Sequence, residues 1–162
     1  MSRVKTITIG LISDTHDLLR PEAIEALKGS DHIIHTGDIG KAKILKELGR
    51  IAPVTAVRGN CDEGWRSAVL PPETAILEVG EVLMFLIHSN AGAGRDYPIK
   101  GYDVIVSGHT HVPEAVVKKG IWFVNPGSAG PRRPGKPVSV GRLLIEGKTV
   151  TPHLIELEVW DG

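Results

Sequence analysis

The chain has 162 residues, the length of one average domain, and its 19 basic and 19 acidic side chains cancel at neutral pH. This balance argues against a broad nucleic-acid-binding surface, and no apolar stretch approaches the about 20 residues that span a bilayer. Because Cys61 is the single cysteine, no internal disulfide can form, and we expect one domain over residues 1–162 in the reducing cytoplasm.

Strand and helix patterns alternate in the first half of the chain. β-branched runs predict strands at 4–13, 32–35 and 54–57. The segments 21–27 and 41–48 have the composition and apolar spacing of short helices. This order of elements predicts parallel strands covered by helices.

The second half of the chain is dominated by hairpin patterns. Three pairs of short apolar runs flank the turn-forming dipeptides Gly80-Glu81, Lys119-Gly120 and Gly147-Lys148. A short apolar run at 104–106 predicts a further strand, and the glycine- and proline-rich segment 125–137 predicts a surface loop. We therefore expect a second, more antiparallel sheet packed on the first. The paired runs are 74–79 with 82–87, 115–118 with 121–124, and 139–145 with 149–159.

Seven potential metal ligands lie in five segments, each just after an apolar run. In open α/β sheets, ligands bind beyond the carboxyl ends of the strands, so side chains that are scattered in sequence can converge there. Oxygen and imidazole donors suit divalent ions such as manganese, iron, nickel, zinc or magnesium. Seven donors are about right for two ions that share a carboxylate, and two-metal sites mostly hydrolyse phosphate esters. The seven are Asp14, His16, Asp38, Asn60, His88, His109 and His111.

Local spacing supports a shared site. Asp14-Thr15-His16 and His109-Thr110-His111 each contain an i, i+2 pair, whose side chains point to the same side of an extended backbone. Each pair could therefore serve one metal. Gly37, Gly59 and Gly108 directly precede Asp38, Asn60 and His109, where glycine permits a tight and unusual backbone.

Each ligand taken alone also has an ordinary structural explanation. Asp14 could cap a turn or a helix, and Asn60 could be a turn residue. His88 alone would more often be a hydrogen-bonded histidine of the core or its rim. It is the repeated placement after five separate strands that favours a metal site over these alternatives.

The ordered motifs of this chain resemble those of a known family. They are Asp14-Thr15-His16, Gly37-Asp38, Gly59-Asn60-Cys61-Asp62, His88, Gly108-His109-Thr110-His111 and Asn125-Pro126-Gly127-Ser128. This set resembles the calcineurin-like metallophosphoesterases, and most closely their small bacterial and archaeal phosphodiesterases. The resemblance covers nearly the whole chain. It implies an α/β (α+β) fold with four layers, in which two mixed β-sheets lie face to face with helices outside.

The resemblance also implies how the ligands divide between two metals. One metal would bind Asp14, His16 and His111, the other would bind Asn60, His88 and His109, and Asp38 would bridge both. A hydroxide between the ions would attack phosphorus in line with the departing alkoxide, which makes Asp38 and Asn60 catalytic candidates as well. We expect two divalent ions, with manganese favoured over nickel, iron, zinc or magnesium. We also expect a small phosphoester as substrate and no membrane partner. The sequence does not decide whether the chain forms a homo-oligomer.

Departures from the family pattern concern the substrate. Cys61 stands where many members have a proton-donating histidine, and since a thiol is a poor replacement we predict weak activity on esters with basic leaving groups. Asn90 replaces a second histidine and either binds a phosphate oxygen or water, or has no role. Arg58 either holds phosphate or is simply solvated. The segment 89–102 lacks a helix pattern, and we expect it to edge the substrate pocket and set specificity.

These observations favour a metal-dependent phosphodiesterase. A phosphomonoesterase of the same fold is the first alternative, which Cys61 disfavours. A non-catalytic metal-binding scaffold is the second, because a retromer subunit of this fold serves mainly in protein assembly. That subunit has eroded ligand positions, whereas all seven are intact in this chain. A serine hydrolase using Ser13 or Ser107 is the most distant alternative, since the Gly-x-Ser-x-Gly motif is absent.

Overall fold

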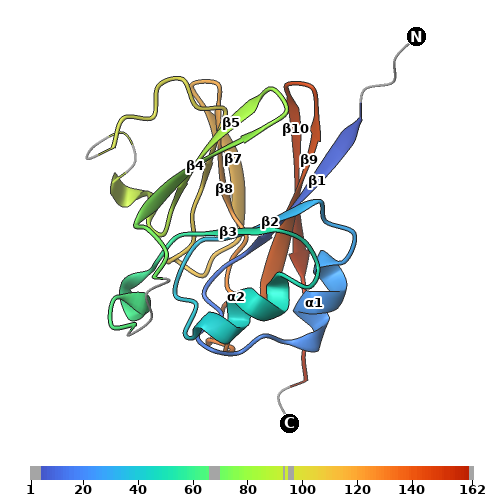
Figure 1. Cartoon of the computed structure of the whole chain (residues 1–162), viewed down its shortest axis with the longest axis vertical. Helices are drawn as coiled ribbons and strands as arrows, with labels where there is room; N and C mark the ends of the chain where they lie inside the picture. The colour runs from blue at the N-terminus through green and yellow to red at the C-terminus, as the bar shows by residue number, and fades with distance from the viewer. Residues whose placement is uncertain (1–4, 66–69, 93, 95–96, 161–162) are drawn as a thin grey trace.

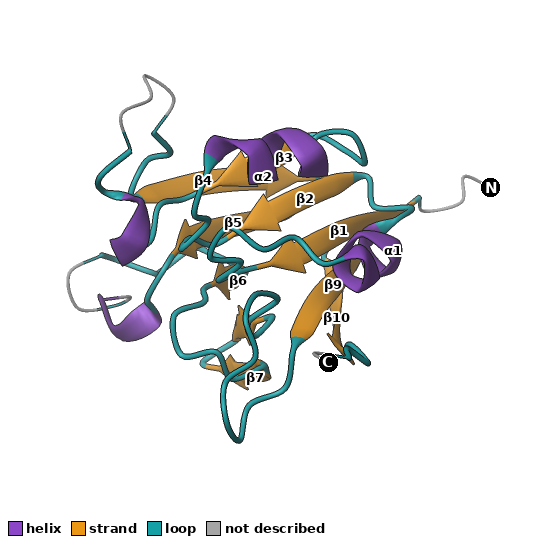
Figure 2. Ribbon diagram, turned by 90° about the horizontal axis from the view of Figure 1, so that it is seen from below, coloured by secondary structure: helices purple, strands orange, loops and turns teal. Residues whose placement is uncertain are grey.

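Two mixed five-stranded β-sheets pack face to face, and two short α-helices lie against the outer side of one of them (Figure 1; Figure 2). The computed structural model describes residues 5–65, 70–92, 94 and 97–160. The predicted sandwich of two mixed sheets is confirmed. The prediction that all three hairpins belong to a second, more antiparallel sheet is wrong. The third hairpin, formed by residues 139–146 and 149–156, pairs with the strand at 6–12 in the first sheet, and among the described residues each sheet has two parallel and two antiparallel strand pairs. The first residue of the strand predicted at 4–13, and residues 93, 95 and 96 of the segment 89–102, lie outside the described residues.

The first sheet, sheet A, has the order β10-β9-β1-β2-β3. Its strands are β1 (Thr6–Ile12), β2 (His32–His35), β3 (Val54–Ala56), β9 (Ser139–Glu146) and β10 (Thr149–Glu156). The first three run parallel, and Ile12, His35 and Ala56 are aligned across them. Because the C-terminal ends of these three strands are in register, the segments that follow them leave the sheet at the same edge.

The second sheet, sheet B, has the order β4-β5-β6-β8-β7. Its strands are β4 (Thr74–Val79), β5 (Val82–Ile87), β6 (Val104–Val106), β7 (Glu114–Lys118) and β8 (Ile121–Asn125). Here too the three central strands are parallel, with Leu86, Val106 and Val124 aligned. The segments after β5 and β6 therefore also leave sheet B at a common edge.

The alternation of side chains along the strands creates two large cores. Leu11 and Ile34 point between the sheets, where Leu86 and Val106 of sheet B meet them in a fully buried layer. Their neighbours on the opposite face of sheet A pack under the helices α1 (Pro21–Leu27) and α2 (Ala42–Leu48). The hydrophobic layer between the sheets thus fixes how the two strand edges face each other.

The outer face of sheet B has a different cover. Phe85 and Ile105 are buried there beneath Tyr97, Ile99 and Tyr102 of the connection between β5 and β6. In the described part of this connection the helical element is a 3-10 turn, η2 (Asn90–Gly92). The absence of a helix pattern in this segment predicted such a loop-like layer.

The segment 125–137 differs from its prediction as a surface loop. Its first half, Asn125 to Gly130, is buried, and only residues 131–136 are exposed. The side-chain amide of Asn125 donates to the Gly108 carbonyl at 2.9 Å and Ser128 Oγ donates to the Asp14 carbonyl at 3.1 Å. Polar side chains thus satisfy backbone groups that would otherwise be buried without partners, which allows this irregular segment to lie inside the protein. Within the described residues, no helix has the length and apolar character to cross a membrane.

Candidate metal centre

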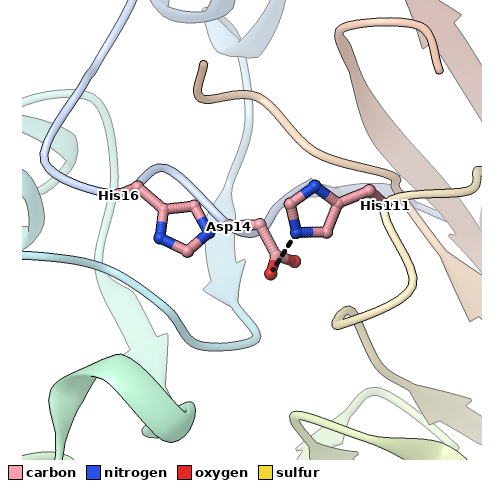
Figure 3. Close-up of side chains that lie close together, drawn as sticks. All are labelled: Asp14, His16 and His111. Atoms are coloured by element: carbon pink, nitrogen blue, oxygen red, sulfur yellow. Dashed lines mark ion pairs between the residues drawn. The ribbon is translucent and has the colours of Figure 1, made fainter. Parts of the chain in front are cut away.

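Asp14, His16 and His111 come from the two sheets and meet between them (Figure 3). Asp14 and His16 follow β1, whereas His111 follows β6. Asp14 Oδ1 lies 3.2 Å from His111 Nε2, and one potential ligand atom from each of the three residues lies within 4.8 Å of the others. This cluster contains the three residues that the resemblance assigns to one metal.

Asp38 lies between this cluster and a second group of histidines. Its Oδ2 atom is 3.8 Å from His16 Nε2 and 3.4 Å from His88 Nε2. His88 Nε2 in turn lies 3.3 Å from His109 Nδ1. One carboxylate thus contacts both halves of the centre, which is the position that a bridging ligand requires.

Asn60 begins the 3-10 turn η1 (Asn60–Asp62) and is exposed. It lines a cavity of about 210 Å³ together with Arg58, His88, Ser89 and Tyr97. Asn60 therefore lies on the His88 side of the centre, although its amide makes no hydrogen bond with the other described ligands. The cavity is the recess that opens directly beside the metal ligands.

The predicted substrate residues are placed unequally. Arg58 lines the cavity and donates to the Pro71 carbonyl at 3.3 Å. The Cys61 amide donates to Asp38 Oδ1 at 2.9 Å, and its exposed thiol is close enough to form a potential ligand group with His16 and Asp38. Asn90 is exposed, and among the described residues it is Ser89 that lines the cavity instead.

The backbone at the ligands contradicts one prediction. We expected the two i, i+2 pairs to lie on extended backbone, but φ is +54° at Asp14, +45° at His16, +71° at His109 and +63° at His111. The backbone at Asp38 also lies in the left-handed region, with φ of +54°. Residues other than glycine adopt this backbone conformation at a cost in free energy, and such residues cluster at functional sites. The pairs also divide differently from that expectation, since His109 contacts His88 while His111 contacts Asp14.

Hydrogen bonds between neighbouring loops hold this strained backbone in place. The Asp14 amide donates to the Gly37 carbonyl and the His16 amide to the Asp38 carbonyl, both at 2.9 Å. The carboxylate of Asp62 accepts from the amides of Gly59 at 2.8 Å and Ile39 at 2.9 Å. Asp62 therefore joins the loop after β2 to the loop after β3.

His35 contacts two of the loops that carry ligands, a role that its sequence pattern did not reveal. It is fully buried, accepts from the Gly37 amide through Nδ1 at 3.1 Å, and lies 3.0 Å from Thr15 Oγ1 through Nε2. Because the Thr15 hydroxyl donates to the Ile39 carbonyl, it must accept from the imidazole. Burial, together with the nearby His88, lowers the pKa of His35 to about 3. A neutral imidazole with one donor and one acceptor thus connects the loops after β1 and β2.

Two glycines allow the ligands to approach the neighbouring backbone. A Cβ atom at position 59 would lie 2.2 Å from Asp38 Oδ1, and one at position 108 would lie 2.0 Å from Ser13 Oγ. Neither glycine has a positive φ, so the predicted unusual backbone is not the reason for glycine at these two positions. Glycine is needed there because a side chain would collide with neighbouring atoms. Gly37 does have a positive φ, of +105°.

The electrostatics of the centre favour an ionised carboxylate next to oriented imidazoles. Burial opposes ionisation of Asp38, but hydrogen bonds from His88 and the Cys61 amide and the nearby histidines lower its pKa below the ordinary range. Burial likewise opposes protonation of His88, yet Asp38 and Asp14 raise its pKa. His88 Nδ1 donates to the Thr36 carbonyl at 2.7 Å, which directs Nε2 toward Asp38 and His109.

These donors fit divalent metal ions. Asp14 Oδ1 and His16 Nε2 are buried and make no hydrogen bond with a described residue. His111 Nε2 and Asp38 Oδ2 face them at 3.2 and 3.8 Å without forming one, a costly arrangement unless a ligand binds these atoms. The other carboxylate oxygen, Asp14 Oδ2, accepts from Ser13 Oγ at 2.6 Å and from the His109 amide at 3.1 Å. Such outer contacts orient a carboxylate for coordination.

The sequence and the fold of this chain are similar to those of known proteins. The family model described as the calcineurin-like phosphoesterase superfamily domain matches residues 7–148. A probable metallophosphoesterase from Methanocaldococcus jannaschii is 36% identical, in an alignment that covers 94% of this chain and 83% of the relative. A solved structure of an archaeal phosphodiesterase superposes with a TM-score of 0.75 at 26% identity, covering 92% of this chain and all of the other. Vacuolar protein sorting 29 from Cryptosporidium parvum has the same fold, with a TM-score of 0.74 at 21% identity and coverage of 95% and 99%.

Proposed function

The chain belongs to the calcineurin-like phosphoesterase superfamily, and we propose that it is a phosphodiesterase that works with two divalent metal ions. The observation that carries this proposal is the position of Asp38, whose Oδ2 lies within 3.8 Å of His16 and 3.4 Å of His88. A carboxylate between two groups of imidazoles is the arrangement that joins a pair of metals. When bound, such a pair supplies an activated water as the nucleophile and offsets charge on the phosphoryl oxygens.

The side chains of this protein have separate roles in the proposal. Asp14, His16 and His111 would hold one ion, while Asn60, His88 and His109 would hold the other. Thr36 fixes the tautomer of His88, since its carbonyl accepts from Nδ1 and leaves Nε2 for the metal. The carboxylate, imidazole and amide donors suit manganese, and they also accept nickel, iron, zinc or magnesium.

The cavity of about 210 Å³ beside Asn60 and His88 is the proposed place for one organic group of the ester. Arg58 would bind phosphate there, because it lines the same cavity as Asn60 and His88. Ser89 and Tyr97 contribute the wall from the segment 89–102, which supports its proposed role in specificity. Asn90 is exposed outside this wall, and it remains a candidate only for contact with a substrate that extends beyond the cavity.

The expected preference for esters with weakly basic leaving groups rests on Cys61. Burial, followed by the nearby Asp38 carboxylate, raises the pKa of its thiol, so the group is neutral and holds its proton tightly. A neutral thiol protonates a departing alkoxide poorly, whereas p-nitrophenolate leaves without a proton. We expect p-nitrophenyl diesters to react much faster than matched alkyl diesters, and equal rates would contradict this role for Cys61.

The proposed function is tested by a panel of metals against bis(p-nitrophenyl) phosphate, with bound metal measured in the same samples. Wild type is expected to bind two ions and to lose activity in chelator. Asp38→Ala is expected to lose bound metal and more than about a hundredfold in kcat/KM, because even outer partners of metal ligands are worth about 10–100-fold. Lys148→Ala, an exposed residue of the β9–β10 hairpin, is the control. Binding of two metals without hydrolysis of any ester would favour the scaffold alternative.

A further inference from the structure

The exposed loop 131–136 lies beside the metal centre and carries three cationic side chains, Arg132, Arg133 and Lys136. It continues from the buried segment that ends at Gly130, where a Cβ atom would lie 2.5 Å from the Asp14 and Thr15 carbonyl oxygens. Lys136 Nζ donates to the Thr110 carbonyl at 2.8 Å, and Thr110 stands between two of the metal ligands. The loop is thus attached to the centre at both of its ends.

A broad recess of about 840 Å³ opens over this loop. Leu18 lines one side, two residues beyond His16, and Arg20 lines its base. Glu156 is the one acidic side chain of the lining, against four cationic ones. Because the whole chain has no net charge, this local excess of positive charge is a property of the recess and not of the general surface.

The loop is also held in one shape before any ligand binds. Three prolines, at 131, 134 and 137, restrict its backbone, and the Lys136 amide donates to the Arg133 carbonyl at 3.1 Å to close a turn. Arg20 Nε donates to the Gly130 carbonyl at 3.1 Å. An anion that binds a pre-formed cationic loop pays little for ordering it, which favours specific recognition.

Arg133 is the side chain available to such an anion. Its guanidinium makes no hydrogen bond or salt bridge with a described residue, while Lys136 is bonded to Thr110. Arg133 lines the same recess as Lys136, whose bond to Thr110 places this part of the loop next to the metal ligands His109 and His111. Guanidinium groups bind phosphate through two parallel hydrogen bonds.

We propose that the loop 131–136, with Arg133 as its principal contact, binds a second phosphate group carried by one arm of the diester substrate. This inference rests on the proposed function and names the class of substrate: a diester in which one arm bears a further phosphate. The other arm then lies in the cavity lined by Asn60 and Tyr97, on the His88 side of the centre. The two arms of the substrate are therefore distinguished by their charge.

The test compares two substrates with the same leaving group, thymidine 5′-(p-nitrophenyl phosphate) and its 3′-phosphorylated form. With metal-loaded wild type we expect kcat/KM to be about tenfold or more higher for the phosphorylated substrate, the worth of one charge-assisted contact. Arg133→Ala is expected to bring this ratio close to one, Arg133→Glu to invert it, and Arg133→Lys to keep part of it. Lys148→Ala, which removes one positive charge at the far end of β9, is expected to keep the wild-type ratio.

A binding measurement separates this inference from the proposed function. Calorimetric titration should show tighter binding of thymidine 3′,5′-bisphosphate than of the 5′-monophosphate, with the difference lost in Arg133→Ala. If neither ester is hydrolysed but this difference is present, the proposed function fails while the subsite stands. If both esters are hydrolysed with equal kcat/KM, or if Lys148→Ala changes the ratio as much as Arg133→Ala, the inference is overturned.

Discussion

The residues of the centre occupy backbone conformations that a side chain rarely adopts on its own. Asp14, His16, Asp38, His109 and His111 all have positive φ, at a cost on the order of 1–3 kcal/mol each. Hydrogen bonds between the loops offset this cost at Asp14, His16, Asp38 and His109. Their collection at one place is itself an indication of function, independent of the family motifs.

His35 gives a prediction at the scale of a single residue. Its pKa is near 6.5 in an unfolded chain and about 3 in the folded protein. Between these values the unfolded state binds a proton that the folded state does not, so stability is lost as the pH falls from 6.5 toward 3. We expect the free energy of unfolding of His35→Gln, measured with urea in the presence of chelator, to fall less steeply than that of the wild type as the pH is lowered. The difference in slope should be up to about 1.4 kcal/mol for each pH unit.

The control for His35 is His153, which is exposed on β10. His153→Gln should reproduce the pH dependence of the wild type. If His35→Gln and the wild type lose stability in parallel over this range, the buried imidazole is not the group that titrates.

At the scale of elements, the centre depends on parallel strands whose C-terminal ends are in register. Ile12, His35 and Ala56 are aligned in sheet A, and Leu86, Val106 and Val124 in sheet B. Each following loop starts at the same edge and has only a few residues in which to present its ligand. Close contacts between these loops then decide where the ligands lie.

Gly59 tests the contact between the loops after β2 and β3. Gly59→Ala would place a methyl group 2.2 Å from Asp38 Oδ1, so Asp38 must move away from the histidines. We expect a loss of about 10–100-fold in metal affinity and about 1–3 kcal/mol in stability. Gly64→Ala is the matched control, since a Cβ there meets no atom within 4 Å. Unchanged metal affinity in Gly59→Ala, measured by competition with a chelating dye, would show that the loop contact is unimportant.

Tyr97 tests the segment between β5 and β6. Tyr97 and Tyr102 both contact Phe85, with ring centroids 5.7 and 5.3 Å away, but only Tyr97 is among the residues that line the cavity beside His88. We expect both alanine substitutions to reduce stability, and Tyr97→Ala alone to change KM severalfold across p-nitrophenyl diesters of different size. Equal specificity profiles for the two variants would contradict a role of this segment in substrate selection.

At the scale of the whole molecule, the centre joins the two sheets. The loops of sheet A supply Asp14, His16 and Asp38, and those of sheet B supply His88 and His111. A metal bound between them would oppose separation of the sheets in addition to the apolar layer. Metal binding should therefore stabilise the complete fold and not one loop.

Thermal unfolding measures this connection. Saturation at about 100 times the dissociation constant adds about 2.7 kcal/mol per site, so manganese should raise Tm by several degrees above the value in chelator. In His111→Ala, which removes one proposed metal ligand and the imidazole contact of Asp14, the increase should be clearly smaller. His153→Ala should retain the full increase. An identical increase in His111→Ala would indicate that the ions do not bind between the sheets.

The sequence alone indicated the strands and the hairpins, because apolar periodicity and turn dipeptides are local properties. It also identified the set of potential ligands, since carboxylates and imidazoles directly after apolar runs are visible without coordinates. It did not show that the hairpin of β9 and β10 joins sheet A, because that pairing with β1 is a contact between distant segments. It did not reveal His35, because a histidine between apolar residues on a strand has the same pattern whether it is merely packed or holds two loops together.

Only the tertiary structure decided how the ligands meet. The left-handed backbone at Asp14, His16 and Asp38 arises from hydrogen bonds to loops that lie more than 20 residues away, and it overrides the extended conformation that local spacing favours. The burial of Asn125 and the crowding around Gly59 are likewise contacts between distant segments. Local sequence specifies which groups are available, whereas packing between the two sheets sets their positions, because those positions depend on interactions that no single segment contains.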